Sequence, residues 1–269
     1  MFTDDEFFGS PDRIALARRS ANLWSLLRDN PRYAYYGRLV ALSDPGQDAA
    51  DVLAAMAKLQ GAAVSYFYPV NAAKSLSTQL EQRGLATDRH EHFWGGETAV
   101  TASRRAQEDF ALPADLSVCA IDADTPRQLV GEVAELCQSC DVMPVPGSIM
   151  RGQAQKGICL VACDQDGHPV ATASSYVIHH PSSARSKDAF WGMLATREDR
   201  RGERIALLLG AQAIIHMWER HGVRGFMTGV RADNSSSQAL CKKLGVSDTD
   251  WIYASCIDKE IFGGSSITK

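Results

Sequence analysis

The sequence Leu194-Ala-Thr-Arg-Glu-Asp-Arg-Arg-Gly-Glu-Arg-Ile-Ala206 connects a predicted strand to a predicted helix. Before it, Phe190 to Thr196 is a short apolar run typical of a buried strand. After it, apolar residues recur four, three and four positions apart from Leu207 to Trp218, which predicts a helix over residues 204–221. A strand therefore leads directly into a long helix through a loop rich in arginine.

This loop has the properties of an anion-binding site. The first turn of a helix has N–H groups without intrahelical partners and lies at the positive end of the helix dipole. Gly202 lets the backbone approach a bulky anion, and three arginines add charged donors: Arg200, Arg201 and Arg204. Glu203 opposes this locally, although an acidic residue in a first turn is ordinary dipole compensation. We expect a pyrophosphate here; the alternative is a strand, a basic turn and a helix that bind no ligand.

Three more elements follow the long helix. The pattern predicts a strand over 225–230, a short amphipathic helix over 235–244 and a last strand over 251–257. Asn234 or Ser235 is a suitable N-cap for the short helix, and Gly245 stands where a left-handed residue commonly ends one.

Two motifs in this region, with the order of the elements, resemble the GNAT superfamily of acyl-CoA-dependent N-acyltransferases. Arg201-Gly-Glu-Arg-Ile-Ala206 is similar to the family's pyrophosphate motif Arg/Gln-x-x-Gly-x-Gly/Ala, with Arg204 in place of the inner glycine. Asn234-Ser-Ser-Ser-Gln-Ala-Leu-Cys-Lys-Lys-Leu-Gly-Val246 keeps the spacing of the family's later motif. In that motif Cys241 replaces the tyrosine that often acts as general acid, and Val246 replaces a phenylalanine.

The resemblance extends backwards to about Leu116. Residues 116–121 are a predicted strand, 125–137 a predicted helix, and 157–163 with 168–179 a predicted hairpin around Asp166-Gly167. The resemblance implies an α/β (α+β) fold in which helices flank a mixed, mostly antiparallel sheet.

The length of 269 residues exceeds that of a typical domain, and 45% hydrophobic content suffices for packed cores. We expect an N-terminal α/β unit over 1–110 and a GNAT-like, acyl-CoA-binding catalytic domain over 111–269. The expected join, Glu97 to Pro113, is polar and lacks apolar periodicity. The alternative for this stretch is a surface helix inside one domain.

The first unit has predicted helices over 14–27, 48–60 and 72–83 and predicted strands over 64–70 and 89–94. Its tail repeats the order of the second unit's tail: strand, helix, glycine, strand, with Gly84 matching Gly245. Aligned on these glycines, the two tails share almost no identities, so the repeat is weak. The unit is either a degenerate GNAT-like half or an unrelated α/β cap.

The resemblance implies acetyl-CoA, or another acyl-CoA, as cosubstrate. The pantetheine arm would lie along Leu194, Ala195 and Thr196, and a backbone N–H on the Met193–Leu194 side would face the developing oxyanion. The remaining contacts implied for the cosubstrate are Arg201, Gly202, Glu203, Arg204, Ile205, Ala206, Asn234 and Ser237. The amine of a small molecule or amino acid would attack the thioester directly.

The catalytic groups are harder to predict. The family often places a carboxylate on the strand before the loop, but Phe190 to Thr196 contains none. Glu198 is our candidate base, with Asp188 and His179 as the other ionisable groups nearby in sequence. Cys241 is our candidate acid, because a thiol can protonate a leaving thiolate of similar basicity; the alternative is a small core side chain.

The acceptor pocket is expected near the first helix of the second domain. Met143 and Met150 are candidate lining residues, stiffened by the prolines around Val145. The loop Pro181 to Ala189 is either a lid over the acceptor or a solvent loop.

Cysteine spacing, the N-terminal sequence and the net charge argue against metal-binding, membrane and nucleic-acid-binding proteins. Cys137-Gln-Ser-Cys140 is the only CxxC pair, so we expect no metal site, and the seven cysteines suit a reducing, cytoplasmic environment. The acidic N-terminus does not have the pattern of a signal peptide, and no apolar run reaches the ~20 residues of a membrane span. A net charge of −4 argues against a nucleic-acid partner.

The sequence therefore predicts an N-acyltransferase, acetyl in the simplest case, with a small-molecule amine as its partner. The first alternative is a catalytically silent acyl-CoA-binding module. The second is an α/β protein whose basic loop binds another phosphate ligand.

Overall fold

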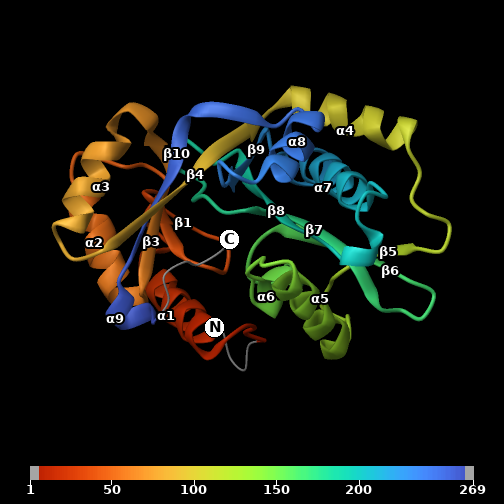
Figure 1. Cartoon of the computed structure of the whole chain (residues 1–269), viewed down its shortest axis with the longest axis horizontal. Helices are drawn as coiled ribbons and strands as arrows, with labels where there is room; N and C mark the ends of the chain where they lie inside the picture. The colour runs from red at the N-terminus through yellow and green to blue at the C-terminus, as the bar shows by residue number, and fades with distance from the viewer. Residues whose placement is uncertain (1–5, 264–269) are drawn as a thin grey trace.

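The computed structural model describes residues 6–263. Its strands form one ten-stranded sheet in the order β1-β2-β3-β10-β4-β9-β8-β7-β6-β5 (Figure 1). The β2–β3 and β8–β9 pairs are parallel, and the other neighbouring pairs are antiparallel. The strands are β1 (Tyr33–Tyr35), β2 (Val40–Leu42), β3 (Ala62–Pro69), β4 (Ala86–Gly95), β5 (Ser117–Ala120), β6 (Gly157–Cys163), β7 (Pro169–Val177), β8 (Asp188–Thr196), β9 (Gly225–Val230) and β10 (Ser247–Ile257). The mixed, mostly antiparallel sheet predicted from the sequence is confirmed.

Helices cover both faces of this sheet. They are α1 (Pro11–Leu27), α2 (Ala49–Gln60), α3 (Ala73–Glu81), α4 (Glu97–Asp109), α5 (Arg127–Ser139), α6 (Gly147–Met150), α7 (Ile205–His221), α8 (Ser235–Lys243) and α9 (Lys259–Phe262), with 3₁₀ turns η1 (Val70–Ala72) and η2 (Glu198–Arg200). Helices α1, α5 and α6 share one apolar cluster with the lower face in Figure 1. Helices α4 and α7 pack on the opposite face, as α2 and α3 do at the N-terminal end. The sheet is therefore the middle layer of three.

The two ends of the chain interleave in the centre of the sheet. Strand β10 lies between β3 and β4, and β4 lies between β10 and β9. In sequence, β3, α3 and β4 follow one another, as do β9, α8 and β10. The last strand of each unit thus occupies the gap between the two strands of the other. Gly84 and Gly245 precede β4 and β10 with φ of 80° and 68°, so both units have the predicted order of strand, helix, glycine and strand.

The stretch expected as a join between domains forms helix α4. Its apolar side packs on α7 with Ala99, Val100 and Ala106 buried. Strand β4 immediately precedes it and pairs with β9 and β10, so elements from both sides of residue 110 share one sheet.

The element boundaries differ from the predicted ones for local reasons. Helix α5 begins at Arg127 rather than Thr125, because the Thr125 hydroxyl bonds Asp122 and Pro126 stands at the N-cap. The short strands β1 and β2, with three residues each, were not predicted, because so few residues show no period. Gly37 between them has φ of 99°, and a Cβ there would lie 2.6 Å from Pro146 Cδ. Only glycine fits that loop without a shift.

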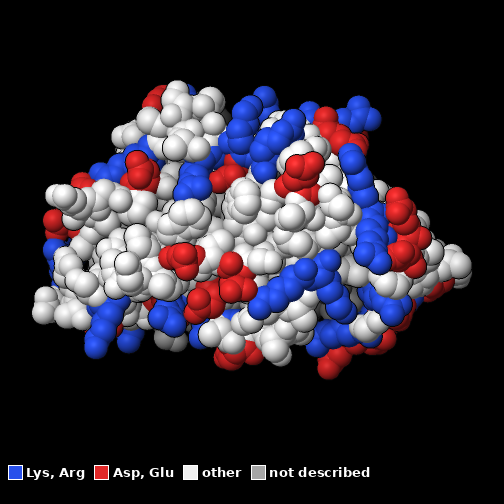
Figure 2. All heavy atoms as spheres, turned by 90° about the horizontal axis from the view of Figure 1, so that it is seen from above, with Lys and Arg blue, Asp and Glu red and all other residues white. Residues whose placement is uncertain are grey.

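Charges of both signs are interspersed on the face seen in Figure 2. Within residues 6–263, the structure contains no helix with the length and apolar character needed to cross a membrane. In the same part of the chain, no cluster of three or more His, Cys, Asp or Glu side chains is arranged to hold a metal ion.

Candidate active site

A cavity of about 200 Å³ lies where β8 and β9 diverge. The two strands pair from Asp188↔Gly225 to Phe190↔Met227, and beyond this pair each strand continues without the other. At Met193 the backbone has φ of 52°, and the pairing of β8 with β7 shifts register between Thr172 and Ser174. This bulge makes β8 bend away from β9, and Gly192, Met193 and Leu194 line the resulting opening.

The loop after β8 leaves the start of α7 open to an anion. Arg204 is the N-cap residue of α7, with φ of 63°, and its side chain makes no capping hydrogen bond. Gly202 has φ of 89°, and no atom lies within 4 Å of the position of a Cβ. The first-turn N–H groups therefore keep their capacity to bind a ligand. The left-handed conformation also explains why the family has glycine at the position of Arg204.

The arginines of this loop are not equivalent. Arg200 donates to both carboxylate oxygens of Asp115 and of Glu203, so it is already neutralised, and so is the Glu203 charge that opposed an anion. Arg204 stacks over Phe110, with 4.4 Å from its Cζ to the ring centroid. Arg201 is exposed and makes a 3.3 Å hydrogen bond from Nε to the Thr196 carbonyl oxygen. Arg201 remains the arginine best placed to contact an incoming anion, which fits a pyrophosphate.

Helix α8 borders the same cavity. Asn234 caps it, because its Oδ1 accepts a 3.1 Å hydrogen bond from the Ser237 backbone N–H. Asn234, Ser237 and Cys241 all line the cavity, as does Leu194. Cys241 is 2% exposed, and burial raises the pKa of its thiol to about 12. This pKa keeps Cys241 in the thiol form at neutral pH.

The candidate bases near β8 in sequence do not line the cavity. Glu198 is exposed on η2. Burial raises the pKa of Asp188. A 3.2 Å hydrogen bond from Trp94 Nε1 and the charge of Arg185 lower this pKa by a smaller amount. His179 is buried, its Nδ1 lies 2.6 Å from Ser43 Oγ, and burial lowers its pKa to about 3.

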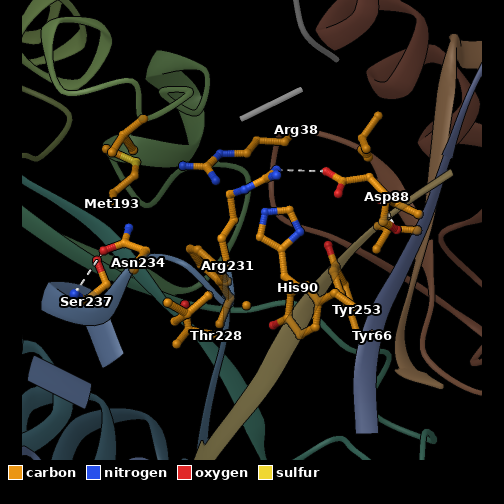
Figure 3. A pocket seen from close by; sticks show the side chains of 18 of the residues that line it. Arg38, Tyr66, Asp88, His90, Met193, Thr228, Arg231, Asn234, Ser237 and Tyr253 are labelled. Carbon is orange, nitrogen blue, oxygen red and sulfur yellow. Dashed lines mark hydrogen bonds and ion pairs between the residues drawn. The ribbon is translucent and has the colours of Figure 1, made fainter. Parts of the chain in front are cut away.

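Two of the ionisable groups that do reach the cavity come from β4, a strand of the expected N-terminal unit. Asp88 and His90 lie on the same face of β4, opposite Ser255 and Tyr253 of β10 (Figure 3). Asp88 forms a 3.2 Å ion pair with Arg231, which follows β9. Burial lowers the pKa of His90, as does Arg231, while Asp88 acts in the opposite direction. His90 is therefore a neutral imidazole at pH 7.

The predicted pocket residues Met143 and Met150 do not line this cavity. They are 1% and 0% exposed and pack into the core beside α5 and α6, because the strand-facing side of this segment is apolar. Asp141 and Val142, just before them, line the cavity instead. The segment expected near the acceptor thus reaches the cavity through the two residues that precede Met143.

The fold and the cavity together define a mixed α/β protein in which two parallel strands diverge beside a helix start without a side-chain cap. Residues 133–246 match the model of the acetyltransferase (GNAT) family. The family model thus covers the part of the chain from α5 to the end of α8, where the sequence already resembles this family. No curated protein has a matching sequence.

Solved structures with this fold cover most of the chain. A GCN5-related N-acetyltransferase from Kribbella flavida has 15% identity and a TM-score of 0.58, over 91% of this chain and 95% of that one. A tandem GNAT protein from the clavulanic acid biosynthesis pathway, solved without AcCoA, has 13% identity and a TM-score of 0.53, over 94% and 90%. At these identities the likeness shows the fold alone, and it extends beyond residues 133–246 into the N-terminal part.

Proposed function

We propose that this protein is an acyl-CoA-dependent N-acyltransferase that acylates the amine of a small molecule. The observation that carries the proposal is the opening between β8 and β9. It lies beside the uncapped start of α7 and leads into a cavity with a neutral imidazole. One side of the opening suits a thioester of coenzyme A, and the other suits an amine that must lose a proton.

On the donor side, Arg201 and the N–H groups of residues 202–206 would hold the pyrophosphate. The unpaired edge of β8 at Leu194 to Thr196 offers backbone groups to the pantetheine arm. Asn234 and Ser237 border the same passage. When bound, the cosubstrate supplies an activated acyl carbon.

On the acceptor side, His90 accepts a proton from the amine, either directly or through one water molecule. An alkylammonium has a pKa near 10.4, and only its free base is nucleophilic, so a neutral acceptor group in the cavity assists the attack. A C–N bond forms, the C–S bond breaks, and the leaving sulfur takes up a proton from water. In this proposal residues 111–269 bind the cosubstrate and residues 1–110 supply the acceptor wall.

The first test is thermal unfolding with acetyl-CoA and, separately, with ATP. At a ligand concentration ~100 times Kd, binding adds about 2.7 kcal/mol to the free energy of unfolding. For a protein of this size this corresponds to a midpoint shift of roughly 5 to 10 °C. We expect the shift with acetyl-CoA alone. An equal shift with ATP, or none with acetyl-CoA, would contradict the assignment of the loop.

The second test measures release of the coenzyme A thiol with a panel of amines. We expect an amine-dependent rate above the hydrolysis background. Binding of acetyl-CoA without thiol release from any amine would instead assign the protein as a silent acyl-CoA-binding module.

A further inference from the structure

The Arg38 guanidinium reaches the cavity with neither a hydrogen-bond acceptor nor an ion-pair partner within residues 6–263. Arg38 lies on the loop between β1 and β2, next to Gly37, and lines the cavity. Its Nε and Nη2 are buried, and neither forms a hydrogen bond. Within residues 6–263, no carboxylate forms an ion pair with it. Arg231, the other arginine of the cavity, is by contrast paired with Asp88 at 3.2 Å.

Aromatic side chains surround the Arg38 guanidinium. Its Cζ lies 5.4 Å from the ring centroid of Tyr36 and 5.7 Å from that of Phe190, and these two rings stack 4.1 Å apart. Tyr66 and Tyr253, with ring centroids 4.8 Å apart, line the same cavity. The Tyr253 hydroxyl is also buried without a hydrogen-bond partner. Figure 3 shows Arg38, His90 and Tyr253 around one cavity.

These groups are hydrogen-bond donors that lack an acceptor. A guanidinium does not lose its proton in a protein, so Arg38 stays charged in the cavity. Withdrawing part of a charged group from water without a partner is unfavourable, and cation–π contacts offset only part of that cost. Burial raises the pKa of Tyr253 well above its usual range, so its hydroxyl keeps its proton. An anion in the cavity would accept hydrogen bonds from both groups.

A carboxylate is the anion that best matches this arrangement. The planar guanidinium presents two N–H groups that a carboxylate accepts side by side, and a phenol O–H adds a third donor.

We propose that Arg38 and the Tyr253 hydroxyl bind a carboxylate of the substrate, so that the acceptor is an amino acid. This inference rests on the proposed function. The alternative is that the bound carboxylate belongs to the acyl donor, as in a dicarboxylic acyl-CoA. We favour the acceptor, because Arg38 and His90 both come from the N-terminal part, whereas the donor-side residues come from β8 and α8.

The experiment compares wild type with Arg38→Gln and Arg38→Lys. The acceptors are the common L-amino acids and their carboxamides, and the donor is acetyl-CoA. The control is Arg89→Gln, because Arg89 lies on β4 between Asp88 and His90, but its side chain is 61% exposed and does not line the cavity. We expect wild type to prefer amino acids over carboxamides.

In Arg38→Gln we expect KM for the preferred amino acid to rise by about 30-fold or more, the usual effect of removing one member of a buried charge pair. KM for acetyl-CoA and the rate with the carboxamide should stay near the wild-type values. Arg38→Lys should restore part of the loss, because it keeps the charge but not the paired donors.

A second arm replaces acetyl-CoA by succinyl-CoA, with the carboxamides as acceptors. A preference for succinyl-CoA that disappears in Arg38→Gln would assign the carboxylate to the acyl group and overturn the amino-acid assignment. Equal use of amino acids and carboxamides, with unchanged kinetics in Arg38→Gln, would overturn the inference while leaving the acyltransferase function intact.

A binding readout keeps the inference testable if no acceptor is acylated. Amino acids, but not carboxamides, should raise the unfolding midpoint of wild type and leave that of Arg38→Gln unchanged. Without ligand, the midpoint of Arg38→Gln should equal or exceed that of wild type, because an unpaired buried charge is removed. A clear fall, or no protection by any amino acid, would overturn the inference.

Discussion

His90 has the charge state that proton transfer from an amine requires. Buried histidines are commonly structural, and His92 on the same strand is one: its Nδ1 lies 2.9 Å from Thr249 Oγ1. His90 differs, because its side chain lines the cavity and forms no hydrogen bond within residues 6–263. Its neighbours Asp88 and Arg231 neutralise each other, so the imidazole experiences mainly the effect of burial.

Replacement of His90 by glutamine should lower kcat/KM by roughly 10²- to 10⁴-fold, the usual contribution of a general base. In wild type the acid limb of the pH profile should lie below pH 6.5, because the folded pKa of His90 is lowered from that value. The limb should be absent in the variant. His168→Gln, on an exposed turn, is the control; wild-type activity in His90→Gln would contradict the assignment.

Cys241→Ala should change kcat by less than about threefold. A thiol with a pKa of about 12 is a weak donor to a leaving thiolate, whose conjugate acid has a pKa near 8.5. The measurement is single-turnover acyl transfer at pH 7 and pH 9. A loss of about 100-fold at both pH values would assign the proton donor to Cys241 instead.

At the scale of the element, the start of α7 has three arginines with different partners. Arg200 is paired with carboxylates and Arg204 is stacked on Phe110, whereas Arg201 has no carboxylate partner within residues 6–263. Arg201→Ala should raise the Kd for acetyl-CoA by about tenfold or more, because a hydrogen bond to a charged group contributes about 1.5 to 3 kcal/mol. Arg220→Ala, at the far end of the same helix, is the matched control. Calorimetric titration with acetyl-CoA provides the measurement, and equal affinity in the two variants would refute the alignment of the pyrophosphate motif.

The helices and strands could be predicted from the sequence more fully than the order of the strands in the sheet. The strand over 225–230 and the helix from Asn234 follow directly from apolar spacing and a capping residue, and both are confirmed. Strand β10 was predicted from Trp251 but begins at Ser247, because its polar start shows no alternation and is held by pairing with Phe93 and Trp94. Which strand lies beside which is not a local property of the sequence. For that reason Asp88, His90 and Arg38 were missed, although His90 lies on a predicted strand and Asp88 directly precedes it.

At the scale of the molecule, two buried histidines make stability depend on pH. Burial lowers the pKa of both His92 and His179 to about 3, whereas in the unfolded chain it is near 6.5. Between these values the unfolded state binds more protons, so stability is complete above pH 6.5 and falls as the pH drops toward 3. The slope is roughly 1.4 kcal/mol per pH unit for each histidine.

The unfolding midpoint should therefore fall steeply between pH 6.5 and pH 4.5, and His92→Gln should reduce the slope. Thermal denaturation followed by circular dichroism at half-unit intervals provides the measurement. A midpoint that stays constant over this interval would show that one or both rings gain protons without unfolding.

The interleaved strands also predict how fragments behave. Residues 111–269 produced alone should not form a stable domain, because β9 and β10 would leave the place of β4 empty and expose Phe226 and Tyr253. Coexpression with residues 1–110 should restore a soluble complex. Gel filtration and acetyl-CoA protection of each preparation check this, and a fragment that is folded and binds acetyl-CoA by itself would contradict it.

The same interleaving has a consequence during synthesis. As the chain leaves the ribosome, β3 and β4 emerge early, but the strand that separates them is translated only with residues 247–257. Domains commonly fold from the N-terminus as they emerge, and unpaired strand edges promote aggregation. In this chain the early strands must wait for almost the whole polypeptide. The edges of β3 and β4 therefore stay open until residues 247–257 are made, and the centre of the sheet closes last.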